Sequence, residues 1–179
     1  MKNLPNDITK RLFLLFQNYS ERQEADKLLT QAFNLDLMVG PGQFVRAVLT
    51  LSEGDLNKLK RHLATSDHRD TIMDAERHEG NPGHYFSPPF EDVLEGAIGR
   101  KYNRYVASKL AKQLYQKEIE FKQFVTEFPE DEDDDPDVSE LFSLVEHESG
   151  TGIFGISRGR HRDYIRKVQD LIDRLEHPL

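Results

Sequence analysis

A low hydrophobic fraction (37%) and a high charged fraction (31%) over 179 residues indicate one large or two small domains with a thin core and a large solvated surface. The absence of cysteine excludes disulfides, thiolate zinc sites and cysteine nucleophiles. No apolar run reaches the length of a membrane span, and the first residues, MKNLPNDITKR, lack the apolar core of a signal peptide. We therefore expect a cytoplasmic protein without membrane contact.

The net charge of −8 has its origin in one segment. Residues 127–137, EFPEDEDDDPD, hold eight of the chain's 32 acids and no lysine or arginine. The rest of the chain is balanced, because its remaining acids equal its 24 lysines and arginines. Like charges at this density repel one another and prolines interrupt helices, so we expect residues 129–137 to form an exposed, mobile acidic loop.

The first 79 residues are predicted to form a bundle of about five short helices. The first helix begins near Asn6 or Asp7. Ser20, followed by Gln23, has the pattern of a capping box at the start of the second helix. The apolar residues of that helix recur at i, i+3, i+4, i+7 and i+8, and they are Ala25, Leu28, Leu29, Ala32 and Phe33.

The stretch Gln43–Glu76 has the clearest helical patterning, and it predicts three short helices. Pro41 suits the first turn of the first of them. Ser52 with Asp55 and Asp67 with Asp70 have the spacing of helix starts, since a side-chain oxygen can accept from free backbone N–H groups there. Between these starts Leu56, Leu59 and Leu63 form an apolar stripe, and we expect Leu59 and Leu63 to be buried.

The same stretch carries a family resemblance. It contains L-T-L-S-E-G-D-L-x-K-L followed by D-x-R-D-x-I-x-x-A-E, with A-D-x-L-L in the preceding helix. This pattern resembles a family of small, uncharacterised bacterial helical proteins that read L-x-L-S-x-G-D-L-x-x-L with a later D-W-R-D. The resemblance covers roughly Arg11 to Glu76, and His68 stands where the family often has an aromatic residue. It implies a helical fold and bacterial origin, and no activity.

A loop and a second group of helices follow. Residues 80–89, GNPGHYFSPP, contain three prolines and two glycines, which place a boundary here. A long helix is predicted from about Pro89 to Glu127, with an apolar stripe of Leu94, Ile98, Tyr102, Val106, Leu110 and Leu114. After the acidic loop, Asp137 begins a short helix, residues 149–155 form a glycine-rich loop, and Ser157 precedes a final helix.

These elements together predict an all-α fold, a helical bundle of about seven to eight helices with an acidic loop. Its expected parts are an N-terminal bundle at 1–79 and a C-terminal helical unit at 88–179, because short connections favour neighbouring helices.

Two basic segments are candidate binding sites for anions or partners. Arginines with glycine at the start of a helix attract phosphate or carboxylate groups, although the preceding G-T-G-I-F-G has neither Walker nor dinucleotide spacing. The helix over 96–117 holds six bases and no acid, and its tyrosines could stack on bases of a nucleic acid. The candidate residues are Arg158, Arg160, His161, Arg162, Arg100, Arg104, Lys109 and Lys112.

The acidic loop, with Asp131, Asp133, Asp134 and Asp135, could lie over a basic surface made by Arg158, Arg160 and Arg162 together with Lys109 and Lys112. It would then gate that surface, or mimic a phosphate backbone for a basic partner. The alternative, which we favour, is a solubilising connection that touches nothing.

Two histidine-containing groups could carry chemistry. Glu76, His78, Glu79 and His84 are residue types that bind zinc, iron or manganese, but their spacing matches no closed motif. Asp67, His68, Arg69 and Asp70 could support acid–base chemistry or could simply cap a helix, and we favour capping.

We therefore expect a non-catalytic interaction or regulatory protein, similar to an adaptor, with no cofactor. Its partner is expected to be another protein, chosen through segregated acidic and basic segments. The alternatives are a nucleic-acid-binding protein that uses the 96–117 helix with Arg158, Arg160 and Arg162, and a metal-dependent enzyme that uses Glu76, His78 and His84.

Overall fold

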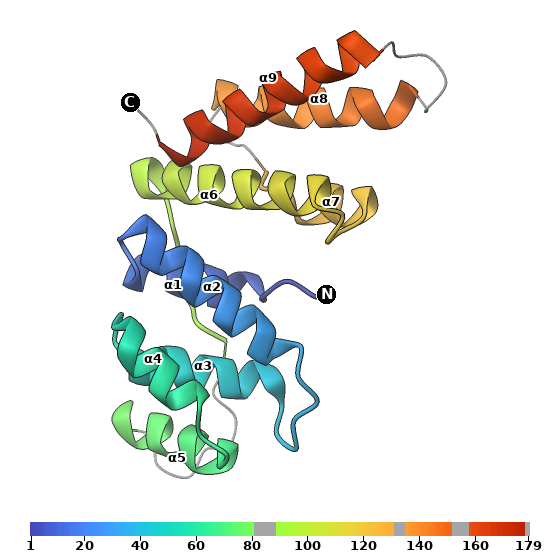
Figure 1. Ribbon diagram of the computed structural model, residues 1–179. Coiled ribbons are helices and arrows are strands. Elements are labelled where there is room, and N and C mark those ends of the chain that lie inside the picture. Colours follow the sequence, from blue (N-terminus) through green and yellow to red (C-terminus); the bar gives the residue numbers. More distant parts are fainter. Residues whose placement is uncertain (81–88, 131–134, 152–157, 178–179) are drawn as a thin grey trace. The chain divides into compact units, whose positions relative to one another are not determined.

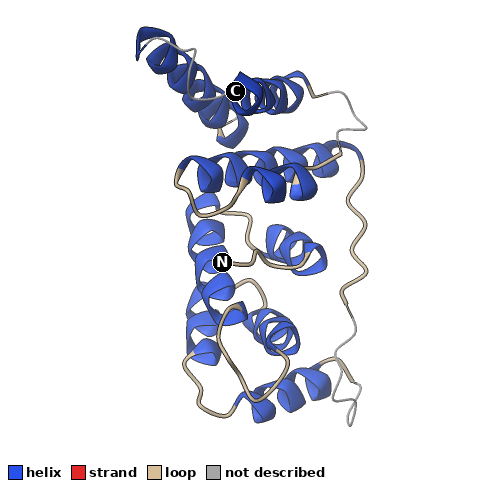
Figure 2. Ribbon diagram, turned by 90° about the vertical axis from the view of Figure 1, so that its right-hand side faces the viewer, coloured by secondary structure: helices blue, strands red, loops and turns tan. Residues whose placement is uncertain are grey.

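The computed structural model describes residues 1–80, 89–130, 135–151 and 158–177, with side chains described outside 148–160. In these ranges the chain forms nine helices and no strand, which confirms the predicted all-α fold (Figure 1, Figure 2). The chain divides into two compact units, Met1–Val93 and Leu94–Leu179. Each unit is described by itself below.

The first unit is organised around its third helix. Its five helices are α1 (Asn6–Leu15), α2 (Tyr19–Phe33), α3 (Pro41–Ser52), α4 (Leu56–Leu63) and α5 (His68–His78). The α3 helix contacts each of the other four. It is also the most apolar of the five, and Phe44, Val45, Ala47, Val48 and Leu49 are all buried on it. Burial of this helix on several sides explains why its apolar residues exceed a single stripe.

The starts of three helices are fixed by side-chain caps. Asp55 accepts from the backbone N–H of Lys58 at 2.8 Å, and Asp67 accepts from that of Asp70 at 2.9 Å. The prediction of a capping box at Ser20 is wrong, because α2 begins earlier and Asn18 accepts from the N–H of Glu21 at 3.1 Å. Asparagine and serine are near-equal caps, so local sequence does not decide between them.

The apolar stripe of α4 is only partly as expected. Leu59 is fully buried, whereas Leu56 and Leu63 are half-buried against the same core. An eight-residue helix presents one central residue to the core most fully, and its terminal turns remain near the surface.

The S-E-G-D motif forms the turn that joins α3 to α4. Ser52, the last residue of α3, donates its hydroxyl to the carbonyl of Leu49 at 2.7 Å, so it closes one helix and does not begin the next. Glu53 follows in the left-handed region, with φ 50°. Its carboxylate pairs with Lys58 at 2.6 Å, and that hydrogen bond lowers the pKa of Glu53 below its usual value.

Gly54 is required in this turn for two reasons. Its φ is +77°, a conformation that residues with a Cβ rarely adopt. A Cβ at this position would also lie 2.7 Å from the carbonyl oxygen of Leu15 in α1. The glycine of the S-E-G-D motif is therefore explained by the packing of this turn against α1.

The Gly54→Ala substitution should destabilise the chain more than Gly80→Ala. Gly80 has the same φ of +77°, but a Cβ there meets no atom within 4 Å. Both substitutions should destabilise the fold by about 1–2 kcal/mol, because alanine must adopt the left-handed conformation. Only Gly54→Ala adds the collision with Leu15, so its chemical-denaturation midpoint should be clearly lower. Equal midpoints for the two variants would contradict the close approach.

Residues 89–93 belong to the first unit because polar contacts attach them to α1. The N–H of Phe90 donates to Asp7 at 3.1 Å, and Arg11 pairs with Asp92 at 2.7 Å. Asp7 also accepts two hydrogen bonds from Arg46 of α3. Burial opposes ionisation of Asp7, but the bonds from Arg46 and Phe90 outweigh it and lower the pKa of Asp7. The division between the units thus falls after Val93, beyond the expected boundary loop.

The second unit is organised around α6 (Gly96–Tyr115), which contacts α7 (Phe121–Glu127), α8 (Pro136–Thr151) and α9 (Arg158–Glu176). The predicted single helix from Pro89 to Glu127 is wrong, because α6 begins only at Gly96 and ends at Tyr115. Its end is a Schellman motif: Glu118 N–H donates to Gln113 at 2.8 Å and Lys117 N–H to Leu114 at 3.1 Å. Lys117 takes the left-handed position, with φ 60°, where glycine is usual.

The second core contains stacked phenylalanines. Phe124 of α7 is fully buried, and its ring centroid lies 5.0 Å from that of Phe128 and 6.1 Å from that of Phe142 in α8. The predicted stripe of α6 is partly confirmed: Leu110 and Tyr102 are buried, but Ile98 is 52% exposed. The α8 helix is longer than expected and includes residues 149–151 of the predicted glycine-rich loop; residues 152–157 lie outside the described ranges.

Candidate interaction site

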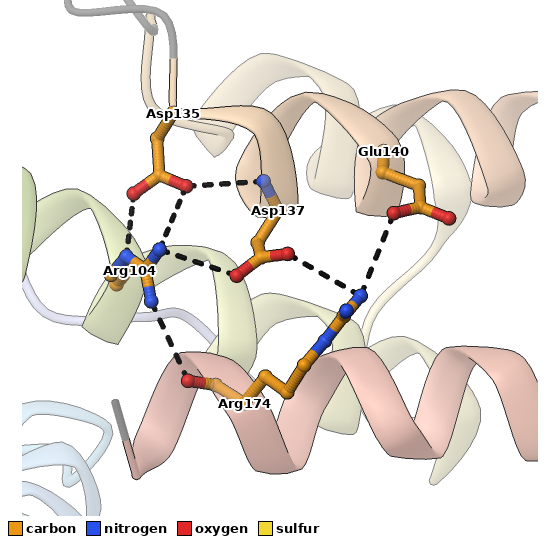
Figure 3. Close-up of polar contacts among 5 residues, drawn as sticks. All are labelled: Arg104, Asp135, Asp137, Glu140 and Arg174. Atoms are coloured by element: carbon orange, nitrogen blue, oxygen red, sulfur yellow. Dashed lines mark hydrogen bonds and ion pairs between the residues drawn. The ribbon is translucent and has the colours of Figure 1, made fainter. Parts of the chain in front are cut away.

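Arg104 lies at the centre of a polar cluster in the second unit. Its guanidinium donates to both carboxylate oxygens of Asp135, at 2.5 and 3.0 Å, and to Asp137 at 3.2 Å. Arg174 of α9 approaches Asp137 at 3.3 Å and Glu140 at 3.5 Å (Figure 3). We call these five residues the arginine–carboxylate cluster, and they connect α6, the start of α8 and α9.

The pair at the centre of this cluster is shielded from water. The side chain of Asp135 is 5% exposed and that of Arg104 is 21% exposed. The hydrogen bond to Asp135 raises the pKa of Arg104 above its usual value; burial opposes this, and the charges of Asp135 and Asp137 add to it. A bidentate arginine–carboxylate pair is among the strongest polar contacts in proteins, so this one fixes α6 to the start of α8.

Asp135 has this position because it also begins α8. Its backbone carbonyl accepts from the N–H of Ser139 at 3.0 Å, and its carboxylate accepts from the N–H of Asp137 at 3.1 Å. Pro136 then occupies the first helical position, where its missing N–H has no cost. The sequence D-P-D is therefore a helix start.

The prediction that 129–137 is an exposed loop is wrong at its C-terminal end. Asp135 is buried and Asp137 lies within α8. Asp131, Asp133 and Asp134 lie outside the described residues. The two described acids at this end of the segment, Asp135 and Asp137, pair with Arg104 and Arg174.

The basic face predicted for the 96–117 helix is partly used inside the unit. Besides Arg104, Lys112 pairs with Glu176 of α9, whose side chain is only 8% exposed. Lys109 also has a partner in the structure. A further polar contact joins the same helices: the hydroxyl of Tyr115 lies 2.8 Å from that of Tyr164, which donates to the carbonyl of Leu144. Arg100 and Lys101 remain exposed on α6.

The first half of α9 carries the exposed positive charge. Residues 158–167 contain five arginines and lysines and a single acid, Asp163. His161, Arg162, Arg166 and Lys167 are exposed, and Asp163 lies 3.6 Å from Arg166. Arg158 and Arg160 begin the helix, but their side chains are outside the description. The second half of α9 instead carries the apolar residues Val168, Leu171, Ile172 and Leu175, which are buried.

The candidate metal ligands are not brought together by the described part of the first unit. Glu76 is 4% exposed, and its Oε1 has no hydrogen-bond partner. His78, two residues further along the same helix, is exposed and lies 3.4 Å from Glu53. Residues two apart on a helix face different sides. His84 lies outside the described residues, and within them no group of three potential ligands is close enough to hold a metal ion.

The Asp67–Asp70 group serves the fold. Asp67 caps α5, as expected. The ring of His68 packs edge-on against Phe44, with centroids 4.5 Å apart. The imidazole therefore packs as an aromatic ring against the core helix α3.

Comparisons with known proteins add no family to this description. No protein-family model, curated protein or solved structure matches the chain. Among the residues that the structure describes, no helix has the length and apolar character needed to cross a membrane.

The sequence indicated Arg104 and Asp135 as separate candidates, but it did not predict that they pair with each other. Arg174 received no attention because it lies in an ordinary amphipathic helix, 70 residues from Arg104. The signal that could have placed Asp135 at the start of a helix was the sequence D-P-D at 135–137. It has the pattern of a capped helix with proline at its first position.

Chemical labelling of lysines should separate the bases used inside the unit from those open to partners. Lys112 should react with an acylating reagent more slowly than the exposed Lys101 and Lys122, because its amine lies against Glu176. Mass spectrometry of peptides gives the rates. Glu176→Gln should raise the rate at Lys112 several-fold and leave Lys101 unchanged. Equal rates at all three lysines in the unmodified chain would contradict the internal pairing.

Proposed function

We propose that the chain is a non-catalytic interaction protein, similar to an adaptor, that binds an acidic protein partner through the first half of α9. The observation that carries this proposal is the exposed positive charge of residues 161–167. Electrostatic complementarity of this kind governs partner choice and association rate.

The placement of this charge is not explained by stability of the helix. The N-terminus of a helix carries a partial positive charge, and acids in the first turn stabilise it. The first turn of α9 contains no acid, but it contains Arg158 and Arg160. Repulsion between this partial charge and each arginine should destabilise the helix by about 0.3–1 kcal/mol. An acidic partner relieves it, which gives the basic residues a role outside the fold.

The use of bases on α6 favours a protein partner over a nucleic acid. A nucleic-acid backbone is best bound by an extended row of free bases. Arg104 and Lys112 are engaged with Asp135 and Glu176, which interrupts the row expected on the 96–117 helix. The alternative of a metal-dependent enzyme that uses Glu76, His78 and His84 has still weaker support. The side chain of Glu76 is buried, whereas that of His78 is exposed.

The proposal is tested with a charge-reversal variant. Arg162→Glu with Lys167→Glu should weaken binding of polyglutamate, used as a defined acidic polypeptide, by at least about tenfold at low salt. Both side chains are exposed, so the unfolding midpoint should not fall. Arg61→Glu with Lys27→Glu is the matched control, because it changes the net charge equally at exposed positions on α4 and α2.

Three outcomes decide the matter. Salt-sensitive binding of polyglutamate that only the α9 variant loses supports the proposal. Equal losses in the α9 variant and the control show a general charge effect and contradict it. Tighter binding of a DNA duplex or single-stranded RNA than of polyglutamate, lost in the α9 variant, replaces the protein partner by a nucleic acid.

A further inference from the structure

A short extended segment of the chain lies on α1 in the way that a bound peptide does. Residues 89–93, PFEDV, are in no helix, and Figure 1 draws them as an extended, light-green trace. Exposed and partly buried residues alternate along the segment: Phe90 and Asp92 are partly buried, whereas Glu91 and Val93 are exposed. This alternation is typical of an extended chain that rests on a surface with one side.

The segment is held by side chains of α1. The backbone N–H of Phe90 donates to the carboxylate of Asp7 at 3.1 Å, and Arg11 donates to Asp92 at 2.7 Å. The guanidinium of Arg11 also lies over the ring of Phe90, 4.2 Å from its centroid, and this ring packs against the core of the unit. Among the described residues, no backbone–backbone hydrogen bond attaches residues 89–93 to another part of the chain. The attachment therefore depends on a few side-chain contacts, as it does for a peptide ligand.

The surface that receives the segment is organised by the helices themselves. Asp7 accepts two hydrogen bonds from Arg46 of α3, at 2.7 and 3.1 Å, and these orient its carboxylate independently of Phe90. Burial opposes ionisation of Asp7, but the hydrogen bonds from Arg46 and Phe90 lower its pKa, so the acceptor carries a negative charge. A site that is already in place loses little conformational entropy when it binds a ligand.

We propose that this surface of α1 is a binding site for an extended segment of a partner protein, and that residues 89–93 occupy it in cis. The ligand has an aromatic residue and, two positions later, a carboxylate, because Arg11 stacks on the first and pairs with the second. Its backbone N–H at the aromatic residue donates to Asp7. Binding of the partner displaces residues 89–93, which makes them an autoinhibitory segment.

The charges of the site argue against other ligands. The carboxylate of Asp7 would repel the phosphate groups of a nucleic acid or a lipid, whereas it accepts readily from a peptide N–H. The same segment of a second copy has the right chemistry but no advantage, because covalent attachment gives the chain's own segment an effective concentration on the order of millimolar. A displacing partner therefore adds contacts beyond those of residues 89–93. This site is distinct from the basic half of α9, and the inference does not depend on the proposed function.

The test uses the peptide PFEDV with blocked ends and the full-length variant Phe90→Ala with Asp92→Asn, which vacates the site. Nuclear magnetic resonance follows the backbone amides of α1 during titration. The peptide should bind this variant several-fold more tightly than it binds the unmodified chain, whose own segment competes. The control peptide PEDVF has the same composition but no acid after its aromatic residue, and it should bind at least about tenfold more weakly.

Substitutions on α1 identify the side chain that recognises the peptide. In the vacated variant, Arg11→Gln should weaken binding of PFEDV at least about tenfold. Lys10→Gln is the matched control, because it removes the same charge from the adjacent residue of α1, which faces another direction. It should change the affinity less than about twofold. The thermal unfolding midpoint of each variant checks that the fold is kept.

A second measurement uses the unmodified chain, so it does not require the vacated variant to fold. An excess of PFEDV should speed hydrogen exchange of the Phe90 N–H several-fold, because displacement releases this group from Asp7, and PEDVF should leave the rate unchanged. The inference is overturned by an unchanged exchange rate with PFEDV, by equal affinities of the two peptides, or by equal effects of Arg11→Gln and Lys10→Gln. A dimer of the unmodified chain that Arg11→Gln dissociates also overturns it, because a second copy then fills the site.

Discussion

The buried pair between Arg104 and Asp135 is the contact on which the second unit most depends. Arg104 lies on the central helix α6, and Asp135 is the residue directly before α8. Arg104 also pairs with Asp137, which in turn pairs with Arg174 of α9. Removing one member of a buried ion pair leaves the other charge uncompensated, which is more destabilising than the pair is stabilising. Charges therefore hold these three helices together in addition to the apolar core that they share.

This pairing also determines which charges can serve a partner. The sequence separates acidic and basic segments, and each segment has members that the fold uses. Asp135 and Asp137 stabilise α8, and Arg104 and Lys112 stabilise the contacts of α6. Among the described bases of α9, Arg174 pairs with Asp137 and Glu140, whereas Arg162, Arg166 and Lys167 lie exposed in the first half of the helix. The exposed bases that no contact inside the unit explains are therefore the candidates for binding a partner.

The first unit shows how far local patterns predict structure. Helical spacing and the cap Asp67 gave α5 near its observed start, because capping depends on groups within one turn. The start predicted at Ser52 is three residues too early, since Asp55 is the cap of α4. The requirement for Gly54 could not be predicted as a packing contact, since Leu15 lies 39 residues away. Asn18 and Ser20 both fit a cap, and only the packing of α2 decides between them.

The second unit shows where such patterns fail. The end of α6 was missed because Lys117 takes a left-handed position that glycine normally signals. The acidic segment was predicted from its composition to be solvated, but two of its acids, Asp135 and Asp137, pair with Arg104, and Asp137 also pairs with Arg174. The exposure of Leu35 and Met38 was also not predicted, because they share a short connection with the partly buried Leu37 and Val39 and give no periodic signal.

A double-mutant cycle on Arg104 and Asp135 tests the central claim most directly. Arg104→Met keeps most of the aliphatic stem, and Asp135→Asn keeps a side chain that can cap α8, so the cycle isolates the ion pair. Unfolding free energies of the unmodified chain, the two single variants and the double variant should give a coupling energy of about 2–3 kcal/mol. Additive effects of the two substitutions would show that the pair does not hold α6 to α8, and the account of the second unit would fail.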